Sequence, residues 1–233
     1  MDKYDPEATV THAGPNRDQV IVRTKVTLDN AKRAEIIKAF SDKYVIEPKN
    51  IAFETIGPTV GKELSTQAII AVLLAFAGIM VYVSFRFEWK FGLAALVALF
   101  HDTAMMVATY AVFQIPVNST FIAALLTIIG YSINDTIVIF DRIRENLKHE
   151  HGRKTDYDKL VNESVTQTLA RSINTSITTL LTILALYFLG VPAIKEFAFP
   201  MIVGIVSGCY STIFIASPVW VILRQKAKAR AAS

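Results

Sequence analysis

The sequence has one cysteine, and long stretches of it carry no charged side chain. Cys209 has no second cysteine to pair with, which excludes an internal disulfide, and its apolar surroundings indicate a packing role. The chain also lacks a glycine-rich phosphate loop and the histidine and cysteine spacing of a metal site. We therefore expect no cofactor.

The composition is that of a membrane protein. Hydrophobic residues make up 52% of the chain and charged residues only 19%, against about 25% charged in soluble domains. The charges cluster near the N-terminus, around 141–171 and in the tail. The apolar runs between them are long enough for the roughly 30 Å hydrocarbon core of a bilayer. The net charge of +4 does not indicate nucleic-acid binding, because the basic residues border these runs.

These runs predict an all-α membrane bundle over residues 65–224, followed by a basic tail at 225–233. The five predicted spans cover about 66–85, 91–113, 119–140, 169–189 and 197–223. The charged connection after the third span is expected to be helical in part.

Residues 1–64 are predicted to form a small α+β domain outside the bilayer. No periodicity is visible in residues 1–17, which we expect to be coil. Partial alternation at 18–26 predicts a strand, a capped apolar stripe predicts a helix to about Tyr44, and 51–56 predicts a second strand. Such a βαβ unit is small for an independent domain, so we expect it to be incomplete.

The basic residues of the short loops predict the orientation. They gather in the loop at 86–90, in the connection at 141–171 and in the tail, whereas the two turns on the other side contain only Lys195. The positive-inside rule then places the C-terminus in the cytoplasm and residues 1–64 outside it. Because no signal sequence precedes this outer segment, we expect an upstream membrane helix in the parent protein.

The third span carries an acid in the middle of its apolar run. Asp135, preceded by Asn134, shares a helix face with Thr127 and Tyr131. An acid at the centre of a membrane helix costs about 2.5–3.5 kcal/mol on insertion scales, and such residues mark ion or proton paths. The structural alternative is a polar contact that holds helices together, with about 0.6 kcal/mol per hydrogen bond.

The fourth span has a polar face of its own, with Arg171, Asn174, Thr175, Thr178 and Thr182 at helical spacing. Arg171 is permanently charged, and on its own it would be expected to reach toward the lipid headgroups. With an acid on the neighbouring span, we predict that it pairs with Asp135. A proton that crosses 100 mV releases about 2.3 kcal/mol, enough to bias a conformational equilibrium.

Other polar and small residues are weaker candidates. His101 and Asp102 in the second span either join a proton relay or form hydrogen bonds with the third span. Gly130, and Gly204 with Gly208 at the G-x-x-x-G spacing, are predicted to allow close helix packing.

Four ordered segments carry a family resemblance. IGYSINDTIVIFDRIREN in the third span, LARSINTSITTLL at the start of the fourth, GPTVGKEL before the first and ALFHDT in the second closely resemble the SecF family of bacterial membrane proteins. The resemblance covers about residues 18–224 and implies membership of the resistance-nodulation-division superfamily. It implies a six-span bundle with a ferredoxin-like outer domain, whose first span this chain lacks.

The resemblance also implies a function. SecF-like proteins are non-enzymatic subunits of the bacterial cell membrane that pair with SecD. With the SecYEG channel they use the proton-motive force to draw a translocating polypeptide outward after SecA has begun its transfer. The acid of the N-D-[TS] motif and the arginine that opens the next span form their proton path, here Asp135 and Arg171.

Three other functions stay open at this point. Proton-coupled efflux of small molecules occurs in the same superfamily, although such pumps have larger outer domains. An intramembrane aspartyl protease would use Asp102 and Asp135, but the GxGD signature is absent from the sequence. A structural scaffold would need Asp135 only for stability.

Overall fold

The structure is a computed structural model that describes residues 8–13, 19–24, 29–42, 51, 58–113, 115, 117–149 and 156–232. The chain divides into two compact units. One comprises residues 1–65 with 113–115, and the other comprises 66–112 with 116–233.

The first unit contains an antiparallel pair of strands and a short helix. β1 (Thr9–Ala13) pairs with β2 (Gln19–Arg23), with Val10 opposite Val22. α1 (Asn30–Ser41) begins after Asp29, whose Oδ1 accepts a hydrogen bond from the backbone N–H of Lys32 at 2.9 Å. This is an N-cap, which satisfies one of the free N–H groups at the start of the helix.

Of two predictions for this unit, the structure contradicts one, and the other falls on residues that the structure does not describe. The coil expected for residues 1–17 is wrong, because β1 forms there. Its β-branched residues Thr9, Val10 and Thr11 suit a strand, but its pairing with β2 is invisible to a search for periodicity. The second strand predicted at 51–56 lies outside the described residues, apart from Ile51.

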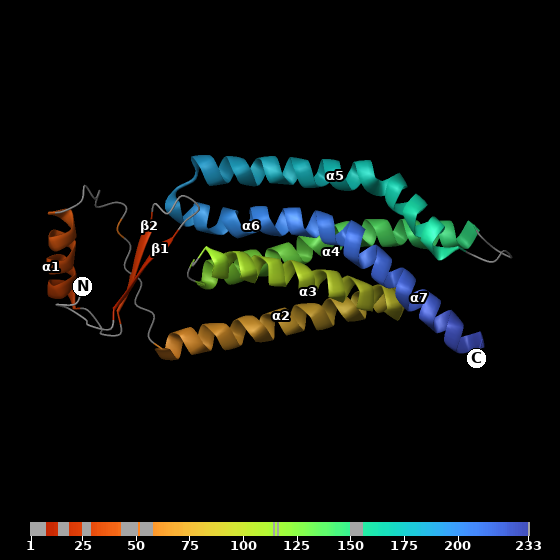
Figure 1. Ribbon diagram of the computed structural model, residues 1–233, viewed down its shortest axis with the longest axis horizontal. Helices are drawn as coiled ribbons and strands as arrows, with labels where there is room; N and C mark the ends of the chain where they lie inside the picture. Colours follow the sequence, from red (N-terminus) through yellow and green to blue (C-terminus); the bar gives the residue numbers. More distant parts are fainter. Residues whose placement is uncertain are drawn as a thin grey trace. The chain divides into compact units, whose positions relative to one another are not determined.

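The membrane unit consists of long helices (Figure 1). They are α2 (Pro58–Arg86, which enters this unit at Thr66), α3 (Trp89–Val112), α4 (Ser119–His149), α5 (Tyr157–Leu189), α6 (Pro192–Ser211), the π-helical segment η2 (Thr212–Ala216) and α7 (Ser217–Ala232). Among the described residues, five helical segments are long and apolar enough to cross a bilayer, with α6, η2 and α7 forming one of them. The predicted five-span bundle is thereby confirmed.

The core of the bundle lies between α3, α4, α5 and α6. α6 packs against each of the other three. α2 is largely exposed, and only 6% of its most apolar stretch is buried inside the bundle. It contacts α3 near its own C-terminal end. There Val83 is fully buried, and Met80 and Ser84 lie beside Gly92.

Polar contacts bring several helix ends together at one end of the bundle. Arg86 at the end of α2 lies 3.7 Å from Asp141 of α4, and Arg224 of α7 binds Glu88 at 2.7 Å. The turn after α2, the C-terminal part of α4 and α7 therefore share one end of the bundle. These are segments that the positive-inside rule assigns to one side of the membrane.

α6 approaches α4 closely at two glycines. A Cβ added to Gly204 would lie 2.5 Å from Ile128 Cγ1, and one added to Gly208 would lie 3.2 Å from Ser132. Gly130 is different, because a Cβ there meets nothing within 4 Å in the described chain. Gly130 lies on the exposed side of α4, so it does not serve the α4–α6 contact.

We expect Gly204→Ala to destabilise the bundle by about 1–3 kcal/mol, because the added methyl group must displace the Ile128 side chain. Unfolding in mixed detergent micelles measures the change. Gly130→Ala is the matched control and is expected to be neutral or slightly stabilising, since it adds a methyl group to open space on a helix. Equal stabilities of the two variants would contradict this assignment of the α4–α6 contact.

Candidate functional site

Asp102 of α3 is enclosed by hydrogen-bond donors. Its Oδ2 accepts from Ser132 of α4 at 2.7 Å and from Ser211 of α6 at 2.8 Å. Its Oδ1 accepts from Ser207 of α6 at 2.7 Å and lies 3.2 Å from Nδ1 of His101. Only 1% of Asp102 is exposed. Of the two roles left open by the sequence, the structure shows the hydrogen bond to the third span.

A second bond between hydroxyl groups adjoins this cluster. Oγ1 of Thr136 on α4 lies 2.9 Å from Oγ1 of Thr212, the first residue of η2. The π-helical segment lies just before Pro218, which has no backbone N–H for an i→i−4 bond. The Oγ of Ser217 donates to the carbonyl of Thr212 at 3.1 Å. Short π-helical segments often occur at functional sites.

Asp135 is buried as well, but one of its carboxyl oxygens is not satisfied. It is 8% exposed, and its Oδ2 has no hydrogen-bond partner among the described residues. Ser172 and Arg171 of α5 are the neighbours that act on this carboxyl. The hydroxyl of Ser172 is also buried and unpartnered within the described part of the chain. Buried polar groups are seldom left in this state, so Asp135 stands apart from Asp102.

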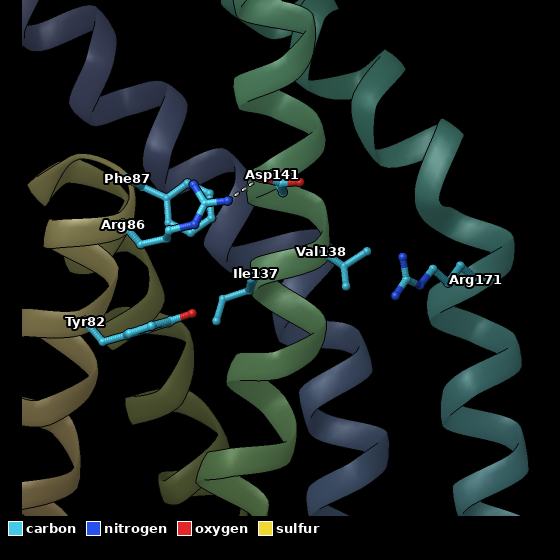
Figure 2. Close-up of a pocket in the computed structure, with 7 residues that line it drawn as sticks. All are labelled: Tyr82, Arg86, Phe87, Ile137, Val138, Asp141 and Arg171. Atoms are coloured by element: carbon cyan, nitrogen blue, oxygen red, sulfur yellow. Dashed lines mark ion pairs between the residues drawn. The ribbon is translucent and has the colours of Figure 1, made fainter.

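Arg171 lies close to Asp135 without pairing with it. In the described residues no ion pair joins the two side chains, so the predicted pair is absent. Figure 2 shows the guanidinium directed toward Val138, one turn of α4 beyond Asp135. Arg171 is also not at the start of its helix, although the resemblance implied that it opens the fourth span. α5 starts at Tyr157, and Arg171 follows roughly four turns later.

An open cavity of about 280 Å³ lies beside this stretch of α4, lined from α2, α4 and α5 and by the turn after α2. Its lining residues are Tyr82, Arg86, Phe87, Ile137, Val138, Asp141 and Arg171 (Figure 2). The cavity thus holds two arginines and an acid beyond the C-terminal side of Asp135.

Apart from Arg171, the polar face predicted for the fourth span has no side-chain hydrogen bond to α4 in the described chain. Its members are exposed, and three of its hydroxyls donate to carbonyls of α5 itself: Thr175 to Arg171, Thr178 to Thr175 and Thr182 to Thr178. The side that α5 buries instead carries small hydroxyl residues four apart: Ser164, Thr168, Ser172 and Ser176. Small residues let helix backbones approach closely in membranes. The four-residue spacing of these small side chains was the signal in the sequence that could have identified the buried face of α5.

The residues predicted to share a polar face of α4 with Asp135 do not all lie on one side of that helix. Asn134 is exposed, although Asp135 next to it is buried. The hydroxyl of Tyr131 donates to Thr179 of α5 at 3.3 Å. The serines at 207 and 211, which hold Asp102, were not identified from the sequence, since serine in an apolar run carries no sign of its partner.

Comparisons with known proteins place this arrangement in a family. Residues 36–226 match the family described as "Protein export membrane protein SecD/SecF, C-terminal". The chain is 42% identical over 227 residues to the protein translocase subunit SecF of Alicyclobacillus acidocaldarius, covering 97% of this chain and 73% of that protein. It is 44% identical to the protein translocase subunit SecDF of Thermus thermophilus over 88% of this chain, which spans only 28% of that larger protein.

The fold agrees with the sequence comparison. The crystal structure of SecDF from Thermus thermophilus, described as a translocon-associated membrane protein, superposes with a TM-score of 0.77 at 40% identity. The match covers 94% of this chain and 29% of the SecDF chain. SecDF in its super-membrane-facing form matches with a TM-score of 0.71 over 97% of this chain and 30% of the other. The chain therefore belongs to the SecD/SecF family of protein export membrane proteins.

Proposed function

We propose that this chain is the SecF-type subunit of a bacterial protein translocase, in which it couples the proton-motive force to the export of polypeptides. Its relatives are named as translocase subunits, which are transport proteins and not enzymes. The observation that carries the proton-driven part of the proposal is Asp135, a buried acid whose Oδ2 has no hydrogen-bond partner in the described chain. Acids inside membrane helices mark proton paths.

In the proposed path Asp135 takes up and releases the proton. Arg171 acts on its carboxyl from α5 without a fixed ion pair, so a small movement between α4 and α5 changes their interaction strongly in a medium of low dielectric constant. Asn134 flanks the acid on the exposed side of α4. Asp102 and His101 lie beside the path and not on it, because the Asp102 carboxyl already accepts three serine hydroxyls.

The proposed assembly and location follow from the relatives. In the SecDF proteins of Thermus thermophilus and Bacillus subtilis a longer chain contains the matching region, which supports SecD as the partner. The SecYEG channel, SecA acting indirectly, the translocating polypeptide and membrane lipid complete the proposed set. We place the chain in the bacterial cell membrane, with residues 1–64 as its extracytoplasmic domain and the tail at 225–233 in the cytoplasm.

The alternative functions lack support. In an aspartyl protease two carboxyls share a proton, but Asp102 and Asp135 are not joined by a hydrogen bond within the described residues, and three serines occupy the Asp102 carboxyl. No observation favours efflux of small molecules.

Co-purification and complementation test the proposal together. We expect the full protein to co-purify with the SecD-type protein of the same cell, and the pair to restore export of a preprotein in membrane vesicles depleted of SecDF. The restored export is expected to disappear when a protonophore removes the proton gradient while ATP is still present. Restoration that persists without the gradient would contradict proton coupling, and failure of the two proteins to associate would contradict the assembly.

A further inference from the structure

The carboxyl group of Asp102 links three helices at one point. Asp102 lies on α3, and its Oδ1 accepts a hydrogen bond from Ser207 of α6. Its Oδ2 accepts one from Ser211 of α6 and one from Ser132 of α4. The three distances of 2.7–2.8 Å are those of well-formed hydrogen bonds between oxygen atoms. The serines are at most 7% exposed, so water does not compete for their hydroxyls.

The second bond ties α4 to the π-helical segment. A threonine hydroxyl has one proton, and Thr136 Oγ1 donates to the carbonyl of Ser132 at 3.1 Å. The proton in the 2.9 Å bond between Thr136 and Thr212 is then supplied by Thr212. Gly208 allows this contact, because a side chain there would press on Ser132.

The two bonded residues of α4 flank Asp135 in sequence and in space. Ser132 precedes it by three positions and Thr136 follows it by one, so on a helix all three lie within about one turn. The face that carries Ser132 and Thr136 is held by α3, α6 and η2. The neighbouring face, with Asp135, meets Ser172 of α5. The rotation of α4 about its axis, which sets how far Asp135 is from α5, is thus fixed by bonds on the neighbouring face.

We propose that Asp102 is a positioning residue for Asp135. Its carboxylate, through Ser132, Ser207 and Ser211, holds α4 in the rotation that keeps the Asp135 carboxyl buried beside α5. Groups that must work at a set distance depend on such a supporting shell of hydrogen bonds. The inference rests on the proposed function, in which Asp135 carries the proton, and it assigns to Asp102 a task that is not proton transfer.

The charged and titratable groups around this part of α4 are few. α5 presents Arg171, and α3 presents Asp102 with His101, whose ring is 30% exposed. Tyr210 of α6 lies against the His101 ring, with centroids 6.0 Å apart. Tyr131 of α4 is bonded to Thr179. Because Asp102 is itself an ionisable group, replacing the serines provides the cleaner test.

The experiment follows the protonation of Asp135 directly, without an export assay. The full protein, purified with its SecD-type partner in lipid vesicles, is treated with dicyclohexylcarbodiimide, which modifies protonated carboxyls in membrane interiors. Mass spectrometry then gives the labelling rate of Asp135 as a function of pH. We expect Ser207→Ala and Ser211→Ala, neither of which alters the charge, to change this rate at least threefold at a fixed pH. Asp102→Asn is expected to change it further.

Ser164→Ala is the matched control, since Ser164 is a fully buried serine of α5 that binds Asn146 and not Asp102. We expect its labelling profile to equal that of the natural protein. If Asp135 is labelled with a clear pH dependence but the Ser207 and Ser211 variants leave the profile unchanged, the positioning role of Asp102 is overturned while the proposed function stands. If Asp135 of the natural protein shows no pH-dependent labelling, both the proposed function and the inference fail.

Discussion

Replacing Asp135 by asparagine is expected to abolish proton-dependent export while the protein still inserts and folds. Asparagine has the same shape but cannot ionise, so the proposed proton carrier is lost. The cost in stability is expected to be small, because Oδ2 of Asp135 has no hydrogen-bond partner to lose among the described residues. We expect the stimulation of export by the proton gradient to fall at least tenfold in vesicles, with unchanged amounts of protein in the membrane.

Asp141→Asn is the control for this change. Asp141 lies on the same helix, but its side chain is 59% exposed and forms a surface ion pair with Arg86. Exposed pairs of this kind contribute at most about 1 kcal/mol, so its loss is expected to leave proton-dependent export near the natural level. Normal export in the Asp135→Asn protein would refute the proton path. A loss of folded Asp135→Asn protein would instead favour the scaffold function.

The architecture of the bundle could be predicted from the sequence because the bilayer imposes a simple requirement. Each span needs about 20 apolar residues, and the five runs satisfy it. The ends of the helices follow other rules, since a helix does not stop where the bilayer stops. α4 continues past the apolar run to His149, and α5 begins at Tyr157 in the charged connection. Hydropathy therefore located the spans correctly but predicted helices that are shorter than those in the structure.

The two membrane acids could be found from the sequence, but their surroundings could not be told apart. The partners of Asp102 are serines on α4 and α6, up to 109 positions away. Serine is common in membrane helices and carries no charge that would indicate a partner. The difference between a satisfied acid at 102 and an unsatisfied one at 135 depends on how α3, α4 and α6 are rotated, which one sequence does not contain.

The face of α5 was predicted the wrong way round for a physical reason. In water a polar stripe marks the outside of a helix, and in a membrane it is expected to mark the inside. In this chain the inner face of α5 is instead lined with small hydroxyl residues such as Ser172 and Ser176, because close backbone approach drives helix association in lipid. The larger polar side chain of Asn174 and the hydroxyls of Thr175 and Thr178 lie on the exposed side.

Trp220→Ala is expected to have the largest effect on stability. Trp220 of α7 is fully buried and stacks on Phe91 of α3, with ring centroids 4.8 Å apart, and Phe91 in turn contacts Phe140 of α4 at 4.9 Å. Tyr157 of α5 meets the indole edge-on at 6.1 Å. The aromatic cluster around this one side chain thus joins four helices at the end of the bundle. Truncating a buried tryptophan leaves a large cavity and costs about 3–5 kcal/mol.

The chain offers a matched control in its other tryptophan. Trp89 is 56% exposed, so Trp89→Ala is expected to change the unfolding free energy by no more than about 0.5 kcal/mol. Trp220→Phe separates packing from hydrogen bonding, because the indole N–H of Trp220 has no partner in the described chain. Phenylalanine keeps the stacked ring and removes that buried N–H, so we expect a loss below about 1.5 kcal/mol. Unfolding in mixed detergent micelles measures all three, and equal losses for Trp220→Ala and Trp89→Ala would show that the aromatic cluster does not hold these helices together.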